Sequence, residues 1–192
     1  FLIDKNTKGY TVGQKYEKMG LRTCSISELL FDNMLVSADS VLGGVGAGSS
    51  IFNFSMEWER VGIAANHVGT MERLVEQTID YANTRKSGSH TIGKNQAVAH
   101  RIANMKTQLE AARLLTYKAA WNIDNNINNA MDASITKLFV SEALSASASD
   151  SMQIHGGNGY MTAFEIERTL RDAIGSTIYS GTSDIQRNII SR

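Results

Sequence analysis

The sequence contains no proline, a single cysteine, no long hydrophobic run and no excess of either charge. Proline breaks helix interiors, so its absence from 192 residues permits long uninterrupted helices. Cys24 has no partner within the chain, which excludes an intrachain disulfide. We therefore expect a reducing compartment, the cytoplasm or, in a eukaryote, the mitochondrial matrix. No apolar stretch approaches the roughly 20 residues that a membrane-spanning helix needs.

The charges cancel, because 19 basic residues face 19 acidic ones. This balance provides no basic stripe for a nucleic acid, so a nucleic-acid-binding function is not expected. The four histidines and the cysteine do not follow the spacing of metal ligands, and we predict no metal site. The chain opens on Phe1-Leu2-Ile3 rather than on methionine. That start predicts that the chain begins inside a strand of a longer protein. The sequence shows no signal peptide pattern, and none is expected before the fold.

The first 44 residues differ in pattern from the rest of the chain. Short β-rich runs at 1–3, 10–12, 29–31 and 34–36 alternate with turn-forming residues, which predicts antiparallel strands. The glycine-rich stretch 43–50 then marks a boundary. It lacks the Gly-Lys-Ser/Thr ending of a phosphate-binding loop, so we interpret it as a linker.

Beyond this linker the apolar spacing changes to about 3.6 residues, the period of a helix. Three stripes predict three long amphipathic helices, separated by breaks at 84–89 and 124–126. Shorter helices are expected near 162–172 and from Ser183 onward. The predicted fold is an α+β fragment, with a partial β-domain of antiparallel strands over 1–44 and an up-down helical bundle over 45–192. The stripes are Val61, Ala65, Val68, Met71, Val75, Ile79 and Ala82; Val98, Ile102, Met105, Leu109 and Ala112; and Met131, Ile135, Leu138, Phe139, Ala143 and Ala146.

Three segments are candidates for a functional site. Ser183 and Gln186 have the spacing of a capping box, and the preceding Gly181-Thr182 lets backbone approach a phosphate or a ring edge. The stretch 153–160 holds three glycines that permit close ligand contact. Glu59 lies on a mixed face of the first long helix. The alternatives are an ordinary helix start, a helix end with its loop, and a solvated acid.

Together these segments resemble the C-terminal half of an acyl-CoA dehydrogenase, a family of flavoenzymes that oxidise acyl thioesters. The likeness covers nearly the whole chain, and 19–22 (Met-Gly-Leu-Arg) is similar to the Met-Gly-x-Arg of the family's β-domain. The resemblance implies FAD as the cofactor and a homotetramer or homodimer. It implies three sets of FAD contacts. The first segment reaches the flavin of a neighbouring subunit, the second is a loop at the adenosine and pyrophosphate portion, and the third is the Gly-Thr motif near the C-terminus. The matching residues are Arg85, Ser87 and Gln96; Gln153, Gly156 and Gly157; and Thr182 and Asp184.

The chain departs from the family pattern at three places. Gly88 and Ser89 stand where Phe-Gly is usual, and Asn95 stands where a phenylalanine often precedes the glutamine. Ser180 occupies the position, directly before the Gly-Thr pair, at which many members carry the catalytic glutamate. Serine cannot remove an α-proton unaided, so the base must lie elsewhere or the chemistry is lost.

Some members, similar to isovaleryl-CoA and long-chain acyl-CoA dehydrogenases, carry the glutamate in a Glu-Arg pair on the first long helix. Here that pair is Glu59-Arg60. The resemblance implies Glu59 as the base and the backbone N–H of Ser180 as a donor to the enolate-like oxygen. It places Arg60 and Gly181 at the substrate.

The function implied is FAD-dependent α,β-dehydrogenation of an acyl thioester carried by CoA or by a carrier protein. A carboxylate removes the α-proton, and the flavin accepts the hydride. Polar residues around Glu59 favour a small polar acyl group, such as a prolyl group. The electron acceptor is electron-transfer flavoprotein or oxygen. The alternatives are a flavin monooxygenase or nitroalkane-oxidase-like relative and a non-catalytic subunit of the same fold. Without the family's earlier domains, the 192 residues alone are expected to bind FAD weakly or not at all.

Overall fold

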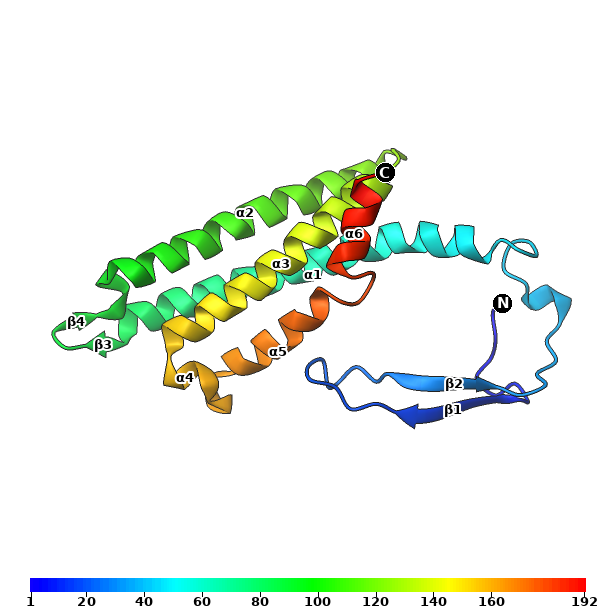
Figure 1. Cartoon of the computed structure of the whole chain (residues 1–192), viewed down its shortest axis with the longest axis horizontal. Coiled ribbons are helices and arrows are strands. Elements are labelled where there is room, and N and C mark those ends of the chain that lie inside the picture. Colours follow the sequence, from blue (N-terminus) through cyan, green and yellow to red (C-terminus); the bar gives the residue numbers. More distant parts are fainter. The chain divides into compact units, whose positions relative to one another are not determined.

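The computed structural model describes all of residues 1–192. The chain divides into two units, Phe1–Ser55 and Met56–Arg192. Figure 1 shows the strands β1 and β2 in the first unit, and the long helices with a small hairpin in the second. The α+β fold class is therefore confirmed, whereas a boundary at residue 44 stays a prediction. None of the helices combines the length and the hydrophobicity of a membrane-spanning segment.

The first unit is built on a two-stranded antiparallel sheet. Strand β1 (Tyr10–Lys15) pairs with β2 (Ser27–Phe31), with Tyr10 opposite Phe31. A short 3-10 helix η1 (Ala38–Ser40) follows. The strands predicted at 1–3 and 34–36 are wrong, because both segments have irregular backbone. A strand exists only where a neighbour pairs with it, and this sheet has no third strand.

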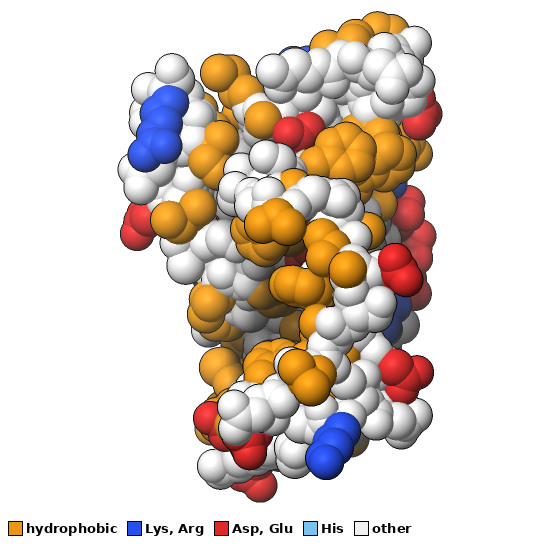
Figure 2. Space-filling model, turned by 90° about the vertical axis from the view of Figure 1, so that its right-hand side faces the viewer, with side chains coloured by type: hydrophobic (Ala, Val, Ile, Leu, Met, Phe, Trp, Pro, Cys, Tyr) orange, Lys and Arg blue, Asp and Glu red, His pale blue; other side chains and the backbone are white.

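The first unit buries almost none of its apolar side chains. Val12, Leu29 and Phe31 are exposed on the sheet, and all the buried hydrophobic residues of the chain lie beyond residue 60. Figure 2 shows one face of the molecule on which hydrophobic side chains are widely exposed and Lys and Arg are few. A two-stranded sheet is marginal in water without a core beneath it. The core of this chain is therefore that of the second unit.

The second unit is a helical bundle. Figure 1 shows α1, α2 and α3 running alongside one another, with α5 and α6 along α3. This confirms the predicted up-down bundle and its two breaks. A small hairpin, β3 (Lys86–Ser87) with β4 (His90–Thr91), connects α1 to α2. The helices are α1 (Gly48–Thr84), η2 (Ile92–Lys94), α2 (Gln96–Asp124), α3 (Ala130–His155), α4 (Gly157–Tyr160), η3 (Thr162–Phe164), α5 (Ile166–Ser176) and α6 (Ser183–Ile190).

One apolar cluster joins the helices of this unit. Met71 and Leu74 of α1 meet Met105 and Leu109 of α2, so the second predicted stripe is confirmed where it is most buried. The third stripe is confirmed only in part, since Phe139 and Ala143 belong to the core while Met131 and Ala146 are exposed. Helix α3 also buries alanines and serines around much of its circumference. Helix α3 packs against α2, α5 and α6. A helix that is covered on several sides needs no single apolar stripe.

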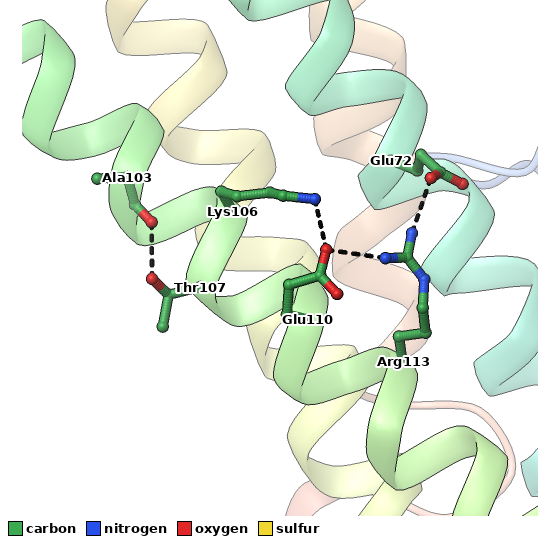
Figure 3. A network of polar contacts seen from close by, with 6 residues as sticks. All are labelled: Glu72, Ala103, Lys106, Thr107, Glu110 and Arg113. Atoms are coloured by element: carbon green, nitrogen blue, oxygen red, sulfur yellow. Dashed lines mark hydrogen bonds and ion pairs between the residues drawn. The ribbon is translucent and has the colours of Figure 1, made fainter.

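A network of charged side chains joins α1 to α2 on the surface. Arg113 Nη2 lies 2.7 Å from Glu72 Oε1, and Arg113 Nη1 lies 2.8 Å from Glu110 Oε1. Lys106 also pairs with Glu110, as Figure 3 shows. Exposed pairs of this kind contribute little to stability, because water and salt screen the attraction. The network therefore adds little to the stability of the bundle, which depends on its apolar core.

Candidate active site

The loop between α5 and α6 brings Ser180 against Glu59 of α1. Ser180 Oγ donates a hydrogen bond to Glu59 Oε1, although the two residues are 121 positions apart. Ser180 has a left-handed φ of 56° and Gly181 a φ of 96°. Glu59 is exposed, so its carboxylate is open to a ligand. The structure thus unites two of the residues that the sequence singles out.

Arg60, the neighbour of Glu59, turns into the protein. Its Nε donates to Ser180 O at 3.4 Å and its Nη1 to Ser134 Oγ at 3.3 Å. Burial lowers the pKa of the Arg60 guanidinium, and the nearby carboxylates of Glu57 and Glu59 oppose that shift. Arg60 therefore holds the loop backbone in place. A contact with substrate stays a prediction.

Two further buried side chains donate hydrogen bonds to the backbone of the same loop. The sequence analysis predicted neither of them. Lys137 of α3 is 2 % exposed, and its Nζ donates to Gly181 O at 2.6 Å. Gln186 of α6 is 0 % exposed, and its Nε2 donates to Ser180 O at 3.1 Å and to Gly181 O at 3.0 Å. A lysine in a helix normally faces water, so nothing in the single sequence marks Lys137 as buried.

The predicted capping box is wrong by one residue. The N-cap of α6 is Thr182, whose Oγ1 accepts a hydrogen bond from Ile185 N at 3.3 Å. Gln186 is occupied with the loop carbonyls, so it cannot complete a box with Ser183. The remaining predicted residue of this motif, Asp184, is exposed and lies 3.3 Å from Arg187 Nη1.

A buried histidine of α1 contacts the tyrosine that directly precedes Ser180. His67 Nε2 and Tyr179 OH are 2.7 Å apart. Burial lowers the pKa of His67 to about 4, and the charge of Lys137 shifts it in the same direction. Burial also raises the pKa of the Tyr179 hydroxyl, together with the charge of Asp172. Both side chains are therefore neutral at pH 7.

The lowered pKa of His67 predicts a loss of stability in acid. The unfolded chain binds this proton near pH 6.5 but the folded chain only near pH 4, so stability falls as the pH drops through that window. The loss reaches at most about 3 kcal/mol. Urea unfolding at pH 7 and pH 4.5 is expected to show a smaller acid-induced loss for His67→Gln than for the wild type. Equal losses in the two proteins would contradict this account.

Gly181 is the second position in the loop with a testable stability effect. A Cβ there would lie 2.5 Å from Gln186 Nε2, and its φ of 96° is unfavourable for an L side chain. Gly181→Ala is therefore expected to lower the free energy of unfolding by about 2 kcal/mol. The control is Gly69→Ala in α1, where no atom lies within 4 Å of the new methyl group and a gain of up to about 1 kcal/mol is expected. The free energies of unfolding are measured with denaturant. Equal changes for Gly181→Ala and Gly69→Ala would contradict a loop held closely by Gln186.

A second candidate site is an open pocket of about 340 Å³ at the other end of α1. It brings together four of the predicted FAD-binding residues, although Gln96 and Gln153 do not line it. Gly156 ends α3 with a φ of 57°, which is the turn that places the following backbone at the pocket. The lining residues are Tyr81, Arg85, Lys86, Ser87, Ile92, Ile154, His155, Gly156, Gly157 and Asn158.

Aromatic rings and cations make up much of this pocket. The rings of Tyr81 and His155 stack with their centroids 4.0 Å apart, and Asn158 Nδ2 donates to Tyr81 OH at 3.0 Å. Burial lowers the pKa of His155, so the positive charges come from Arg85 and Lys86. Flat apolar surfaces beside cations suit a ligand that has a ring and a phosphate.

Two of the three departures from the family pattern lie at or beside the hairpin next to this pocket. Gly88 takes a φ of 66° in the turn between β3 and β4. Asn95 Oδ1 lies 3.1 Å from His90 Nε2. The hairpin is therefore held by polar contacts where the family usually has aromatic residues.

The two candidate sites are far apart on one subunit. Along α1, 22 residues separate Glu59 from Tyr81, which corresponds to about 33 Å. Thr182 and Asp184 belong to the Glu59 end, whereas Arg85, Ser87 and Gly156 belong to the other. The predicted FAD-binding residues thus form two groups.

Comparison with known proteins identifies the class. Residues 46–192 match the family model of the acyl-CoA dehydrogenase, C-terminal domain. The chain belongs to the acyl-CoA dehydrogenase family, as the resemblance implied.

Its relatives include enzymes that act on carrier proteins. The chain is 44 % identical over 192 residues to an L-prolyl-[peptidyl-carrier protein] dehydrogenase of Pseudomonas fluorescens, covering 100 % of this chain and 50 % of that protein. It is 48 % identical to a prolyl acyl carrier protein oxidase of known structure, with a TM-score of 0.96 and coverage of 98 % and 50 %. PigA, solved with FAD and proline, is 37 % identical, with a TM-score of 0.96 and coverage of 99 % and 50 %. The chain spans about half the length of these relatives.

Proposed function

We propose that the protein containing this chain catalyses the FAD-dependent α,β-dehydrogenation of an acyl thioester, with Glu59 as the base. The observation that carries the proposal is the contact between the exposed Glu59 carboxylate and Ser180 Oγ. It sets a carboxylate beside the position at which many family members carry their glutamate. Removal of an α-proton requires a carboxylate in a defined place, and either residue can supply it.

The loop beside Glu59 supports the second requirement, donors for the enolate-like oxygen. The backbone N–H groups of Ser180, Gly181 and Thr182 precede α6 and have no acceptor within the protein. Consecutive N–H groups in left-handed backbone form a concave donor site for an anion. Such donors stabilise the negative charge that develops as the proton leaves for Glu59.

The pocket at the other end of α1 fits part of FAD, because it combines stacked rings, two cations and glycine backbone. Arg85, Ser87, Gly156 and Gly157 would hold the adenosine and pyrophosphate portion, with Gln96 and Gln153 nearby in sequence. Thr182 and Asp184 would lie at the flavin side. When bound, FAD supplies hydride acceptance from the β-carbon.

The separation of about 33 Å between the two groups supports an oligomer. We infer that they serve different FAD molecules, each shared between subunits of a homodimer or homotetramer. An exposed apolar row on α2 supports a subunit contact as well. Leu114, Tyr117 and Trp121 follow one another at spacings of three and four, so they share one helix face. An exposed apolar row of this kind is typical of an interaction surface.

The substrate we favour is an aminoacyl group, prolyl above all, on a carrier-protein arm, with an acyl-CoA as the second choice. Support comes from the carrier-protein relatives and from the polar side chain of Asn66 beside the Glu59 face. The acceptor of the electrons is electron-transfer flavoprotein or oxygen.

The test is flavin absorbance of the full-length protein while thioesters are added without oxygen. A prolyl-loaded carrier protein is expected to bleach the flavin faster than a series of acyl-CoA thioesters. Bleaching by none of them would contradict the proposed function.

A further inference from the structure

We propose that Lys137 is a positioning residue for this reaction, which fixes the loop at Gly181 and thereby aims the backbone donors beside Glu59. The inference rests on the proposed function and deepens it. It assigns a role to a buried side chain whose hydrogen bond goes to the loop backbone.

The environment of Lys137 is unusual for a lysine. The side chain is almost completely buried, and no carboxylate lies within ion-pair distance of it. Burial lowers the pKa of Lys137 to about 8, with the charge of Arg60 acting in the same direction and Glu142 opposing. A buried ammonium without a carboxylate has lost its hydration without the compensation of an ion pair. Its one hydrogen-bond acceptor is Gly181 O, at 2.6 Å, and a bond from a charged donor is stronger than a neutral one.

Lys137 is one of three donors, from three helices, that converge on two successive carbonyls. Arg60 of α1 and Gln186 of α6 donate to Ser180 O, and Lys137 of α3 and Gln186 donate to Gly181 O. Gln186 makes these bonds while its Oε1 stays buried without a partner. The left-handed backbone of Ser180 is itself unfavourable for a residue with a side chain, so it needs such external support.

The direction of these carbonyls determines the direction of the free donors. In a trans peptide the C=O and the following N–H point to opposite sides. Because Ser180 O and Gly181 O point inward to the three donors, the N–H groups of Gly181 and Thr182 point outward. The charged amino group of Lys137 holds the peptide plane between Gly181 and Thr182 through Gly181 O. Without Lys137, this plane is expected to rotate and the Thr182 N–H to change direction.

The experiment compares Lys137→Met with Lys118→Met in the full-length protein. Lys118 is an exposed lysine of α2 that pairs with Asp132, so the control makes the same chemical change away from the loop. Two readings are taken: amide hydrogen exchange at Ser183, which donates to Thr177 O across the loop at 3.2 Å, and kcat per bound flavin.

Lys137→Met is expected to speed exchange at Ser183 at least about 10-fold. We also expect it to lower kcat per flavin about 10- to 100-fold, with KM within about twofold of wild type, because a displaced donor loses transition-state stabilisation rather than binding. Lys118→Met should match wild type in both readings. Unchanged exchange at Ser183, or unchanged kcat per flavin, would overturn the proposal.

The exchange reading needs no turnover, so it separates this inference from the proposed function. If no thioester bleaches the wild-type flavin, the proposed function fails, and the role of Lys137 in the reaction fails with it. If the wild type is bleached but both readings are unchanged in Lys137→Met, only the inference fails. Should Lys137→Met not fold, as judged by circular dichroism, the same two readings on Lys137→Gln decide.

Discussion

Glu59→Gln in the full-length protein is expected to lower the rate of flavin reduction by thioester about 1000-fold. The amide oxygen of glutamine still accepts the hydrogen bond from Ser180 Oγ, so the loop should keep its position while the base is lost. The expected result is therefore a fall in kcat with little change in flavin content. Stopped-flow absorbance of the flavin measures it directly.

The matched control is Glu57→Gln, which removes a carboxylate two residues earlier on the same helix. Glu57 also acts on the guanidinium of Arg60, so the control retains most of the general electrostatic change. We expect a rate within about threefold of wild type, since this carboxylate does not contact Ser180. Equal losses of rate in Glu59→Gln and Glu57→Gln would indicate that the reaction depends on negative charge near the loop and not on Glu59 as the base.

The second large effect is expected at the pocket. Arg85→Ala should weaken FAD binding by about 10- to 100-fold, because a hydrogen bond to a charged group contributes about 1.5–3 kcal/mol. Lys94→Ala is the control, since Lys94 is an exposed cation in the neighbouring η2 and does not line the pocket. Fluorescence titration of the apoprotein with FAD measures both. Affinity in Arg85→Ala equal to wild type would remove the pocket from the FAD site.

Mixed oligomers extend this test to the sharing of FAD between subunits. If Glu59 and Arg85 serve different FAD molecules, an oligomer of Glu59→Gln and Arg85→Ala subunits contains some sites with neither defect. At an FAD concentration too low to load Arg85→Ala alone, the mixture should be more active than either parent. A mixture no more active than the mean of its parents would place both residues at the same FAD.

The sequence predicts the long helices well because their signals are local. Breaks such as 84–89 and 124–126 interrupt the helical period, and the structure ends α1 and α2 there. Predictions that depend on neighbours fail. The runs 1–3 and 34–36 have strand-like composition but no strand to pair with. Helix α3 is covered on several sides, so its apolar stripe marks only part of its buried surface.

The candidate site divides along the same line. The sequence analysis singles out both Glu59 and Ser180. Their contact spans 121 positions, so no local spacing predicts it, and only the family resemblance links the two residues. The roles of Lys137 and Gln186 follow from burial, which single residue types do not encode. Gln186 illustrates this. Its spacing from Ser183 matches a capping box, but its amide donates to the loop carbonyls of Ser180 and Gly181.

The central claim is that Glu59 is the catalytic base, and that its carboxylate lies where a glutamate at position 180 would also place one. The most direct measurement is single-turnover bleaching of bound FAD by thioester in wild type, Glu59→Gln and the double variant E59Q/S180E. The side chains of residues 59 and 180 touch, so a glutamate at 180 returns a carboxylate to the same region. We expect the double variant to recover at least about 10-fold over Glu59→Gln. A double variant no faster than Glu59→Gln, or a Glu59→Gln protein as fast as wild type, would contradict the account.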